Sequence, residues 1–317
     1  MITVVGEALI DLVDEGSGRY QAHPGGGPAN VAVALARLGV PCSMLARVSI
    51  DALGRQLTAH LAGNGVSLRD VVQATEPTTL AMASLDSGAR ASYSFYVNGT
   101  ADWQWTTAEL PGVLPPDVQA LHTGSLALAL EPGAQAIEKL LAAERARGQV
   151  TISIDPNIRP ALAAAHADEV ARVERQFALA HVVKASDEDT AWLYPGVPFE
   201  EVARGWQRLG PRIVVITLGE RGAYALGPDG AGQLRPARPS RVVDTVGAGD
   251  AFCAGLLDAL GRRGLLGGGG MAALARLTPE ELAEVTDWAV LIATLTCGRA
   301  GADPPARDEA LQATAAT

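Results

Sequence analysis

Short and wholly apolar segments recur along this chain, and longer stretches with a helical spacing of Ala and Leu separate them. The expected strands are residues 2–5, 45–48, 150–154, 181–184 and 213–217, and the expected helices are residues 28–38, 53–62, 248–260 and 279–297. Strands without polar alternation are typical of parallel sheets covered by helices on both faces. We therefore predict an α/β fold with a doubly wound, mostly parallel sheet, whose ligands bind beyond the carboxyl ends of the strands.

Residues 80–85 and 92–97 differ from these segments because their polar and apolar side chains nearly alternate. With the connecting loop 86–90 they predict a β-hairpin, and residues 12–21 predict another. Four antiparallel strands without helices of their own indicate a small β lid over the core. The expected division is a core of residues 1–11, 25–77 and 107–317 and a lid of residues 12–24 and 78–106.

The charge of the chain bears on its partners. It carries 35 acidic and 25 basic residues, which gives a formal net charge of −10, and it has no run of Lys or Arg. This composition argues against nucleic acid and anionic membranes as partners.

The three cysteines are far apart and form no CxxC pair, which argues against a zinc site or a disulfide framework and fits a reducing compartment. The start of the chain lacks a basic segment, and the longest apolar stretch, residues 288–297, is too short for a bilayer, so we expect a cytoplasmic protein.

Residues 244–252, Asp-Thr-Val-Gly-Ala-Gly-Asp-Ala-Phe, form the most distinctive local pattern. They follow a strand-like run at 241–243 and open an expected helix. Small residues permit a tight turn, and the first amides of a helix lack intrahelical partners, so such a start binds phosphate or developing negative charge. Asp250 lies where it can accept a proton from a hydroxyl held near those amides. In the alternative interpretation Gly247 and Gly249 only form a turn and Asp250 caps the helix.

The sequence lacks the two glycine-rich loops that most commonly bind nucleotides. The chain has no GxxxxGK[ST] pattern, and Phe252 occupies the third glycine position of a GxGxxG pattern, which argues against a dinucleotide oxidoreductase. The glycine-rich residues 264–270 lack phosphate-loop spacing and are expected to form a surface connection.

A second glycine-rich pattern lies at residues 24–32, Pro-Gly-Gly-Gly-Pro-Ala-Asn-Val-Ala. Its glycines permit close approach of the backbone to a ligand, and Pro28 suits the first helical position. Asn30 then lies in the first turn and offers a donor and an acceptor to a sugar hydroxyl. Asp11, expected at the end of the first strand, is a candidate acceptor for two vicinal hydroxyls. A glycine turn with a solvated Asn30 and a turn residue at Asp11 remain alternatives.

Taken together, the Gly-Gly-x-Pro-Ala-Asn helix start near residue 25 and the Asp-Thr-x-Gly-Ala-Gly-Asp-x-Phe start near residue 244 resemble the two signatures of the ribokinase/PfkB carbohydrate kinase family. The resemblance covers nearly the whole chain. It implies a doubly wound α/β core with a β lid, in agreement with the pattern of apolar residues.

The resemblance also implies roles for individual residues. Asp250 would be the catalytic base, and the amides of Gly247, Ala248 and Gly249 would form the anion hole for the transferring phosphoryl group. The sugar site would include Asp11, Gly26, Gly27 and Asn30. The turn at residues 217–222 is similar to the nucleotide side of the family site, with Thr217, Gly219 and Gly222 near ATP.

Residues 184–189 lie where the family has Asn-x-x-Glu, a network around Mg²⁺ and phosphate. Here Lys184 precedes Ser186, which replaces Asn, and Asp189 replaces Glu with a shorter reach; an acid-rich helix start is the alternative interpretation. The residues Asp244, Val246, Arg299 and Gly301 resemble loops that hold a monovalent cation such as K⁺.

Residues 155–160, Asp-Pro-Asn-Ile-Arg-Pro, are similar to a segment of fructokinases and 2-keto-3-deoxygluconate kinases. By this similarity Asn157 and Arg159 would face the substrate or the phosphates. In the alternative interpretation the segment is only a capped turn. The lid residues 95–102 resemble a segment of fructokinases but have Val97 where Arg is frequent. The loss of this positive charge weakens the case for an acidic sugar as the substrate. The aromatic residues expected to line the sugar site or to pack within the lid or a dimer are Phe95, Tyr96, Trp103 and Trp105.

The implied activity is the transfer of the γ-phosphate of ATP to a sugar hydroxyl with Mg²⁺, and fructose is the expected sugar. A 2-keto-3-deoxygluconate kinase and a ribokinase are the close alternatives. A non-catalytic, sugar-binding regulatory relative is the alternative from another class. The expected partners are a small sugar, ATP and a second copy of the chain, bound through the lid in a homodimer.

Overall fold

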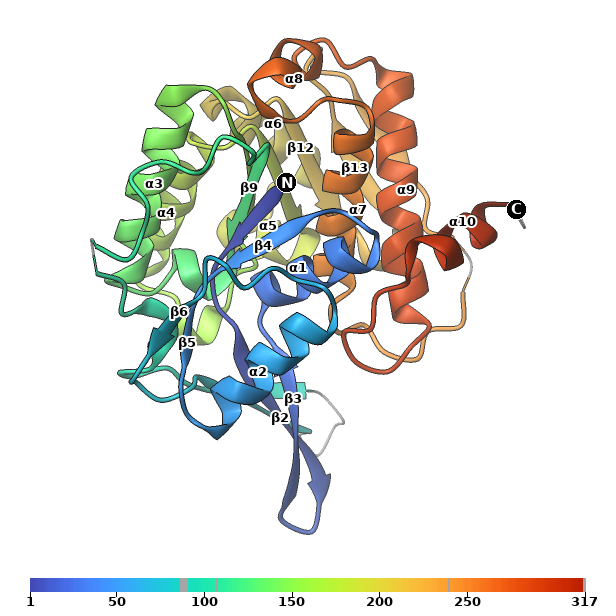
Figure 1. Cartoon of the computed structure of the whole chain (residues 1–317). Helices are drawn as coiled ribbons and strands as arrows, with labels where there is room; N and C mark the ends of the chain where they lie inside the picture. The colour runs from blue at the N-terminus through green and yellow to red at the C-terminus, as the bar shows by residue number, and fades with distance from the viewer. Residues whose placement is uncertain (86–90, 107, 239, 316–317) are drawn as a thin grey trace.

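A large, mostly parallel sheet forms the centre of the molecule (Figure 1). The computed structural model describes residues 1–85, 91–106, 108–238 and 240–315. Across the sheet the order of strands is β14 (Gly232–Arg235), β13 (Ala223–Leu226), β12 (Ile213–Thr217), β11 (Val182–Ser186), β10 (Thr151–Asp155), β9 (Ala120–Gly124), β1 (Ile2–Val5) and β4 (Cys42–Leu45). The pairs from β12 to β4 are parallel, and β13 and β14 join as antiparallel strands at one edge.

Helices cover both faces of this sheet because its strands are apolar on both sides. Val182 packs in the hydrophobic cluster of one face and Val183 in that of the other. The first face carries α1 (Gly27–Arg37), α7 (Ala248–Arg262), α8 (Gly267–Leu274), α9 (Pro279–Cys297) and α10 (Arg307–Ala315), and the second carries α3 (Gly133–Arg147), α4 (His166–Phe177) and α6 (Phe199–Leu209) (Figure 1). The predicted doubly wound fold is therefore confirmed.

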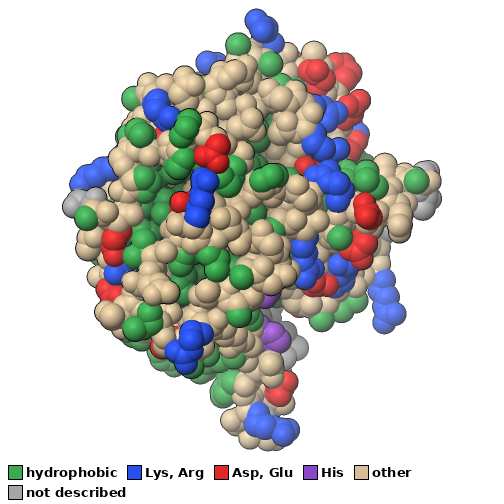
Figure 2. Space-filling model, in the orientation of Figure 1, with side chains coloured by type: hydrophobic (Ala, Val, Ile, Leu, Met, Phe, Trp, Pro, Cys, Tyr) green, Lys and Arg blue, Asp and Glu red, His purple; other side chains and the backbone are tan. Residues whose placement is uncertain are grey.

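A smaller, separate sheet has the order β3 (Arg19–Gly25), β2 (Leu9–Gly16), β7 (Leu80–Leu85) and β8 (Ala91–Tyr96). The β2–β3 hairpin projects away from the rest of the molecule (Figures 1 and 2). The expectation of four antiparallel strands was wrong at one pair, because β2 and β7 run parallel. The expected loop at residues 86–90 lies outside the described residues.

The expected strand at residues 45–48 was wrong, because the segment is divided between two sheets. β4 ends at Leu45, and β5 (Arg47–Ser49) pairs with β6 (Val72–Ala74) in a separate two-stranded sheet. The buried guanidinium of Arg47 forms ion pairs with Glu76 and Glu109, which anchors β5 away from the main sheet.

Two further expectations about the C-terminal third were wrong. Residues 264–270 are not merely a surface connection, because α8 begins at Gly267. A Cβ at Gly268 would lie 2.7 Å from Oε1 of Gln149, so glycine permits this helix to approach the loop before β10. The run at 241–243 is not a strand; the Val243 amide instead donates to the carbonyl of Cys297 at the end of α9.

Acidic and basic side chains are interspersed over the face of the molecule in Figure 2. Among the helices in the described part of the chain, none is both long and apolar enough to cross a membrane.

Candidate functional site

The order of strands reverses between β1 and β9, because the chain continues from β1 to β4 on one side and later returns to β9 on the other. Ligands of doubly wound sheets bind in the crevice beyond the carboxyl ends of strands at such a reversal. A cavity of about 610 Å³ lies here. The predicted site residues that line it are Asp11, Gly26, Gly27, Asn30, Phe95, Asn157, Arg159, Lys184, Ser186, Asp189, Thr217, Gly219, Val246, Gly247, Gly249 and Asp250.

The start of α7 forms one wall of this cavity. Gly247 is the N-cap residue, with φ 74°, and a Cβ at this position would lie 2.6 Å from Cβ of Ala302. Glycine is therefore required both for the left-handed backbone and for the contact with the C-terminal loop. The Ala248 amide donates to the carbonyl of Thr245 at 3.2 Å, and Ala248 is not among the lining residues in the described part of the chain.

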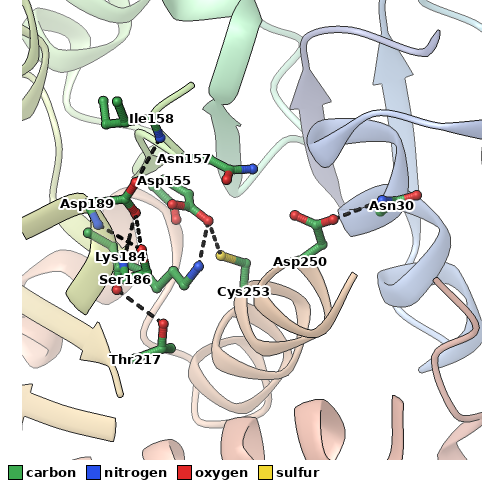
Figure 3. A network of polar contacts seen from close by, with 12 residues as sticks. Asn30, Asp155, Asn157, Ile158, Lys184, Ser186, Asp189, Thr217, Asp250 and Cys253 are labelled. Carbon is green, nitrogen blue, oxygen red and sulfur yellow. Dashed lines mark hydrogen bonds and ion pairs between the residues drawn. The ribbon is translucent and has the colours of Figure 1, made fainter. Parts of the chain in front are cut away.

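Asp250 is the third residue of α7, so the alternative in which it is the N-cap does not hold. Its Oδ2 accepts a hydrogen bond of 2.9 Å from Nδ2 of Asn30 on α1 (Figure 3). Gly27 faces the same point, because a Cβ there would lie 3.2 Å from Nδ2 of Asn157 and 3.4 Å from Oδ1 of Asp250. Burial raises the pKa of Asp250 to about 6, and the hydrogen bond from Asn30 limits the rise. At neutral pH the group is thus an ionised carboxylate that can accept a proton.

Asp11 lies opposite, in β2 of the small sheet, and not at the end of the first strand as expected. Burial raises its pKa to about 6, and the positive charges of Arg159 and His23 oppose that rise. Asn157 has φ 41°, an unusual value for a residue other than glycine, and its Oδ1 accepts a hydrogen bond of 2.5 Å from Arg159. A carboxylate, an amide and a guanidinium thus converge on one side of the cavity.

Among the aromatic residues of the small sheet and the segment after it, Phe95 lines the cavity in the described part of the chain. It packs against a small apolar cluster of Leu9, Ala81, Trp103 and Leu126. Trp103 is buried and donates its indole N–H to the carbonyl of Val97, Trp105 belongs to the main core, and Tyr96 is 54% exposed.

The opposite end of the cavity contains the residues expected on the nucleotide side. Nζ of Lys184 forms an ion pair of 2.8 Å with Oδ2 of Asp155 (Figure 3), and both side chains are buried. Ser186 and Asp189 form a capping box at the start of α5 (Asp187–Leu193), and Oδ1 of Asp189 also accepts the amide of Ile158. The carboxylate of Asp189 is therefore already engaged by protein donors, and burial raises its pKa.

Gly222 has a structural role in the turn after β12. It does not line the cavity, and a Cβ at this position would lie 2.0 Å from the carbonyl oxygen of Arg235. Thr217 and Gly219 do line the cavity, and a Cβ at Gly219 would meet no atom within 4 Å, so space is available beside this turn.

The loops expected to hold a monovalent cation are linked through Asp244. Its Oδ2 accepts the amide of Gly301 at 2.7 Å, and its Oδ1 accepts that of Val246 at 3.1 Å. The guanidinium of Arg299 pairs with Glu309 on α10 and does not face the cavity. In the described residues no group of three or more His, Cys, Asp or Glu side chains is arranged for a metal ion, and a site built from carbonyl oxygens stays a prediction.

Comparisons with known proteins identify the family of this chain. The model of the pfkB family carbohydrate kinases matches residues 1–309. The chain belongs to this family. A fructokinase of Rhizobium leguminosarum bv. trifolii is 37% identical over 270 residues, which cover 84% of this chain and 81% of the relative.

Two solved structures of kinases are similar in fold to nearly the whole chain. A fructokinase with bound ATP from Xylella fastidiosa has a TM-score of 0.89 at 26% identity and covers 99% of this chain and 98% of its own. An aminoimidazole riboside kinase from Salmonella enterica has a TM-score of 0.83 at 26% identity, with 98% of each chain covered. The predicted family is confirmed, and the protein is a sugar kinase.

Several polar residues that line this pfkB kinase site were missed in the sequence, and three of them lie at the ends of strands. Glu7 follows β1, Ser125 follows β9, and Asp155 ends β10, and all three line the cavity. Burial raises the pKa of Glu7 to about 7, although hydrogen bonds from backbone amides and from Ser125 oppose the rise. The available signal was position, because each residue lies at or just beyond the carboxyl end of a strand that borders the crevice.

Proposed function

We propose that this sugar kinase transfers the γ-phosphate of ATP to a hydroxyl of fructose. The observation that carries the proposal is the position of Asp250: an ionisable carboxylate at the first turn of α7, hydrogen-bonded to Asn30 and open to a cavity lined by polar groups. The similar fructokinase from Xylella fastidiosa binds ATP, and the relative from Rhizobium leguminosarum is named a fructokinase.

In this mechanism the sugar lies between Asp11 and Asp250, and the triphosphate extends toward Thr217 and Gly219. Asp250 accepts the proton of the attacking hydroxyl as the oxygen bonds to the γ-phosphorus, and ADP leaves on the opposite side. The amides at the start of α7, with Gly249 foremost, donate to the phosphoryl oxygens as negative charge develops there.

The residues at the phosphate end also fit Mg²⁺. Asp187 and Glu188 line the cavity beside Asp189 and present hard oxygen donors, which Mg²⁺ prefers. Hydrogen bonds already engage Asp189, and Asp187 forms an ion pair with Arg221, so Glu188 and bound water would supply the free contacts. The ion would neutralise charge on the β- and γ-phosphates.

The choice of fructose is supported by the names of similar proteins and by residues 95–102 and 155–159. The similarity to an aminoimidazole riboside kinase indicates that the same fold accepts other sugars. 2-Keto-3-deoxygluconate and ribose are the alternative substrates, and a non-catalytic sugar-binding relative is the alternative of another class.

The proposed reaction is tested by ADP release from Mg-ATP with fructose, ribose, 2-keto-3-deoxygluconate or adenosine, each with and without K⁺. We expect turnover with fructose to exceed that with the other acceptors, and K⁺ to increase it through the loops at Asp244 and Gly301. Preference for another acceptor would reject fructose but keep the kinase mechanism. No turnover, together with a sugar-dependent rise in melting temperature, would favour the binding-only relative.

Two proposals concern the small sheet. We infer that residues 12–24 and 78–106 act as a lid that excludes water from the cavity, since Phe95 in the second segment and Asp11, immediately before the first, line the cavity. We also infer a homodimer formed through the lid, because Val13, Tyr20 and Tyr96 present exposed apolar surface on it.

A further inference from the structure

A buried ion pair lies directly behind the first turn of α7. Lys184, on β11, is 5% exposed, and its Nζ is 2.8 Å from Oδ2 of Asp155 at the end of β10. The same carboxylate oxygen lies 3.6 Å from Sγ of Cys253, which is three residues after Asp250 on α7. Figure 3 shows this pair between the strand ends and α7, on the side of Asp250 away from Asn30.

The ammonium group of Lys184 also lies close to the turn at the start of α7. A Cβ at Gly249 would lie 2.9 Å from Nζ of Lys184, so the lysine packs against the residue that precedes Asp250. Any side chain at position 249 would displace this contact. Lys184 is therefore in place to fix the start of α7, where Gly247, Gly249 and Asp250 line the cavity.

The charged groups that face Asp250 come from three elements. Asp155, on β10, raises the pKa of Asp250, whereas Lys184, on β11, and Arg159, in the loop after β10, lower it. The neighbour from α1 is the neutral amide of Asn30. The charge of Lys184 thus offsets that of Asp155, which without it would stand uncompensated near Asp250.

We propose that Lys184 is a positioning residue for phosphoryl transfer: paired with Asp155, it fixes the first turn of α7 and keeps the carboxylate of Asp250 ionised. This inference rests on the proposed function, in which Asp250 is the base. Direct binding of phosphate by Lys184 is disfavoured, because its ammonium is buried and already paired with Asp155. The pair acts through its balance of charge, so the loss of Lys184 alone should raise the acid midpoint of kcat/KM, and the loss of both members should restore it.

The test compares Lys184→Met, Asp155→Asn and the double variant, with Lys139→Met as a matched control. Lys139 is the other lysine of the chain and lies exposed on α3. The measurements are kcat, the KM values for ATP and sugar, the pH dependence of kcat/KM and the melting temperature. We expect Lys184→Met to move the acid midpoint of kcat/KM upward by about one pH unit. The double variant should return the midpoint toward that of the wild type, and Lys139→Met should change nothing.

Two results would overturn the proposal. A rise in KM for ATP with Lys184→Met, not recovered in the double variant, would indicate direct phosphate binding. A folded Lys184→Met protein with an unmoved acid midpoint would indicate a structural role alone. If that variant does not fold, the midpoint of Asp155→Asn decides: it must fall below that of the wild type. The base assignment is tested separately, since full turnover of Asp250→Asn would reject the proposed function whatever the lysine variants do.

Discussion

At the scale of single residues, the chemistry of the cavity depends on carboxylates that the protein partly shields from water. Asp250 lies on α7 and Asp11 on β2, yet burial raises the pKa of each to about 6. Arg159 acts on both groups, but the other neighbours differ: Asn30, Asp155 and Lys184 act on Asp250, and His23 acts on Asp11. Asp250 is thus suited to accept a proton, and Asp11 to accept hydrogen bonds from hydroxyl groups.

The raised pKa values predict an acid limit to activity. Both groups act as carboxylates, so kcat/KM should be nearly constant above pH 7 and fall as the pH drops through about 6. With two groups titrating together, the fall should steepen to about a hundredfold per pH unit. Asp11→Asn should lower kcat/KM and reduce the limiting slope to about tenfold per unit, because only Asp250 then titrates. The measurement is a pH profile of kcat/KM, and an unchanged profile in Asp11→Asn would contradict this role of Asp11.

At the scale of elements, the start of α7 combines a left-handed backbone with close packing. Gly247 has φ 74° and contacts Ala302, and the adjacent loops are joined through Asp244 and Gly301. The orientation of the first helical amides therefore depends on a loop some fifty residues further along the chain.

Replacing Gly247 by Ala should impair both stability and turnover. The left-handed conformation costs about 1–2 kcal/mol for a residue with a Cβ, and the contact with Ala302 adds to it. Gly264→Ala is the matched control, because Gly264 has φ 67° and open space around its Cβ position. We expect the control to lose only the conformational part in urea unfolding and to keep full kcat. Equal effects of the two substitutions on kcat would contradict the proposed role of this turn.

Elements bounded by local signals were predictable from the sequence. The strand at 213–217 and the helix at 279–297 match β12 and α9 to the residue, and a capping box with Thr278 and Glu281 begins α9. The break after Leu45 was not predictable, because it depends on ion pairs of Arg47 with residues distant in sequence.

The candidate site likewise has residues that were predictable from the sequence and others that were not. The glycine-rich helix starts identified Asn30 and Asp250, whereas the buried partner of Lys184 becomes evident only when β10 and β11 are paired. Sequence spacing gave no indication that Asp155 and Lys184, 29 residues apart, form an ion pair.

At the scale of the whole molecule, the small sheet has two faces with different surroundings. Phe95 points into the apolar cluster beside the cavity, and the next residue, Tyr96, is 54% exposed. Phe95 and Tyr96 therefore lie on opposite faces of β8, one toward the site and the other toward solvent, where we propose that a second copy of the chain binds.

The proposed homodimer predicts a sedimentation mass near twice 32.7 kDa. Tyr96→Glu places a charge on the outward face and should shift the protein to the monomer at micromolar concentration. Leu311→Glu, at a residue 47% exposed on α10, is the control and should leave the dimer intact. A monomeric wild-type protein, or a dimer unaffected by Tyr96→Glu, would reject the lid as the interface.

The most direct test of the account is the turnover of Asp250→Asn with Mg-ATP and the preferred sugar, beside calorimetric binding of both ligands. The substitution keeps the size of the side chain and removes the base, so kcat should fall by about 10²–10⁴-fold. Binding of ATP and sugar should persist, because the hydrogen bond to Asn30 has a neutral equivalent after an amide flip. Turnover close to that of the wild type would contradict the assignment of Asp250 as the base and, with it, the proposed mechanism.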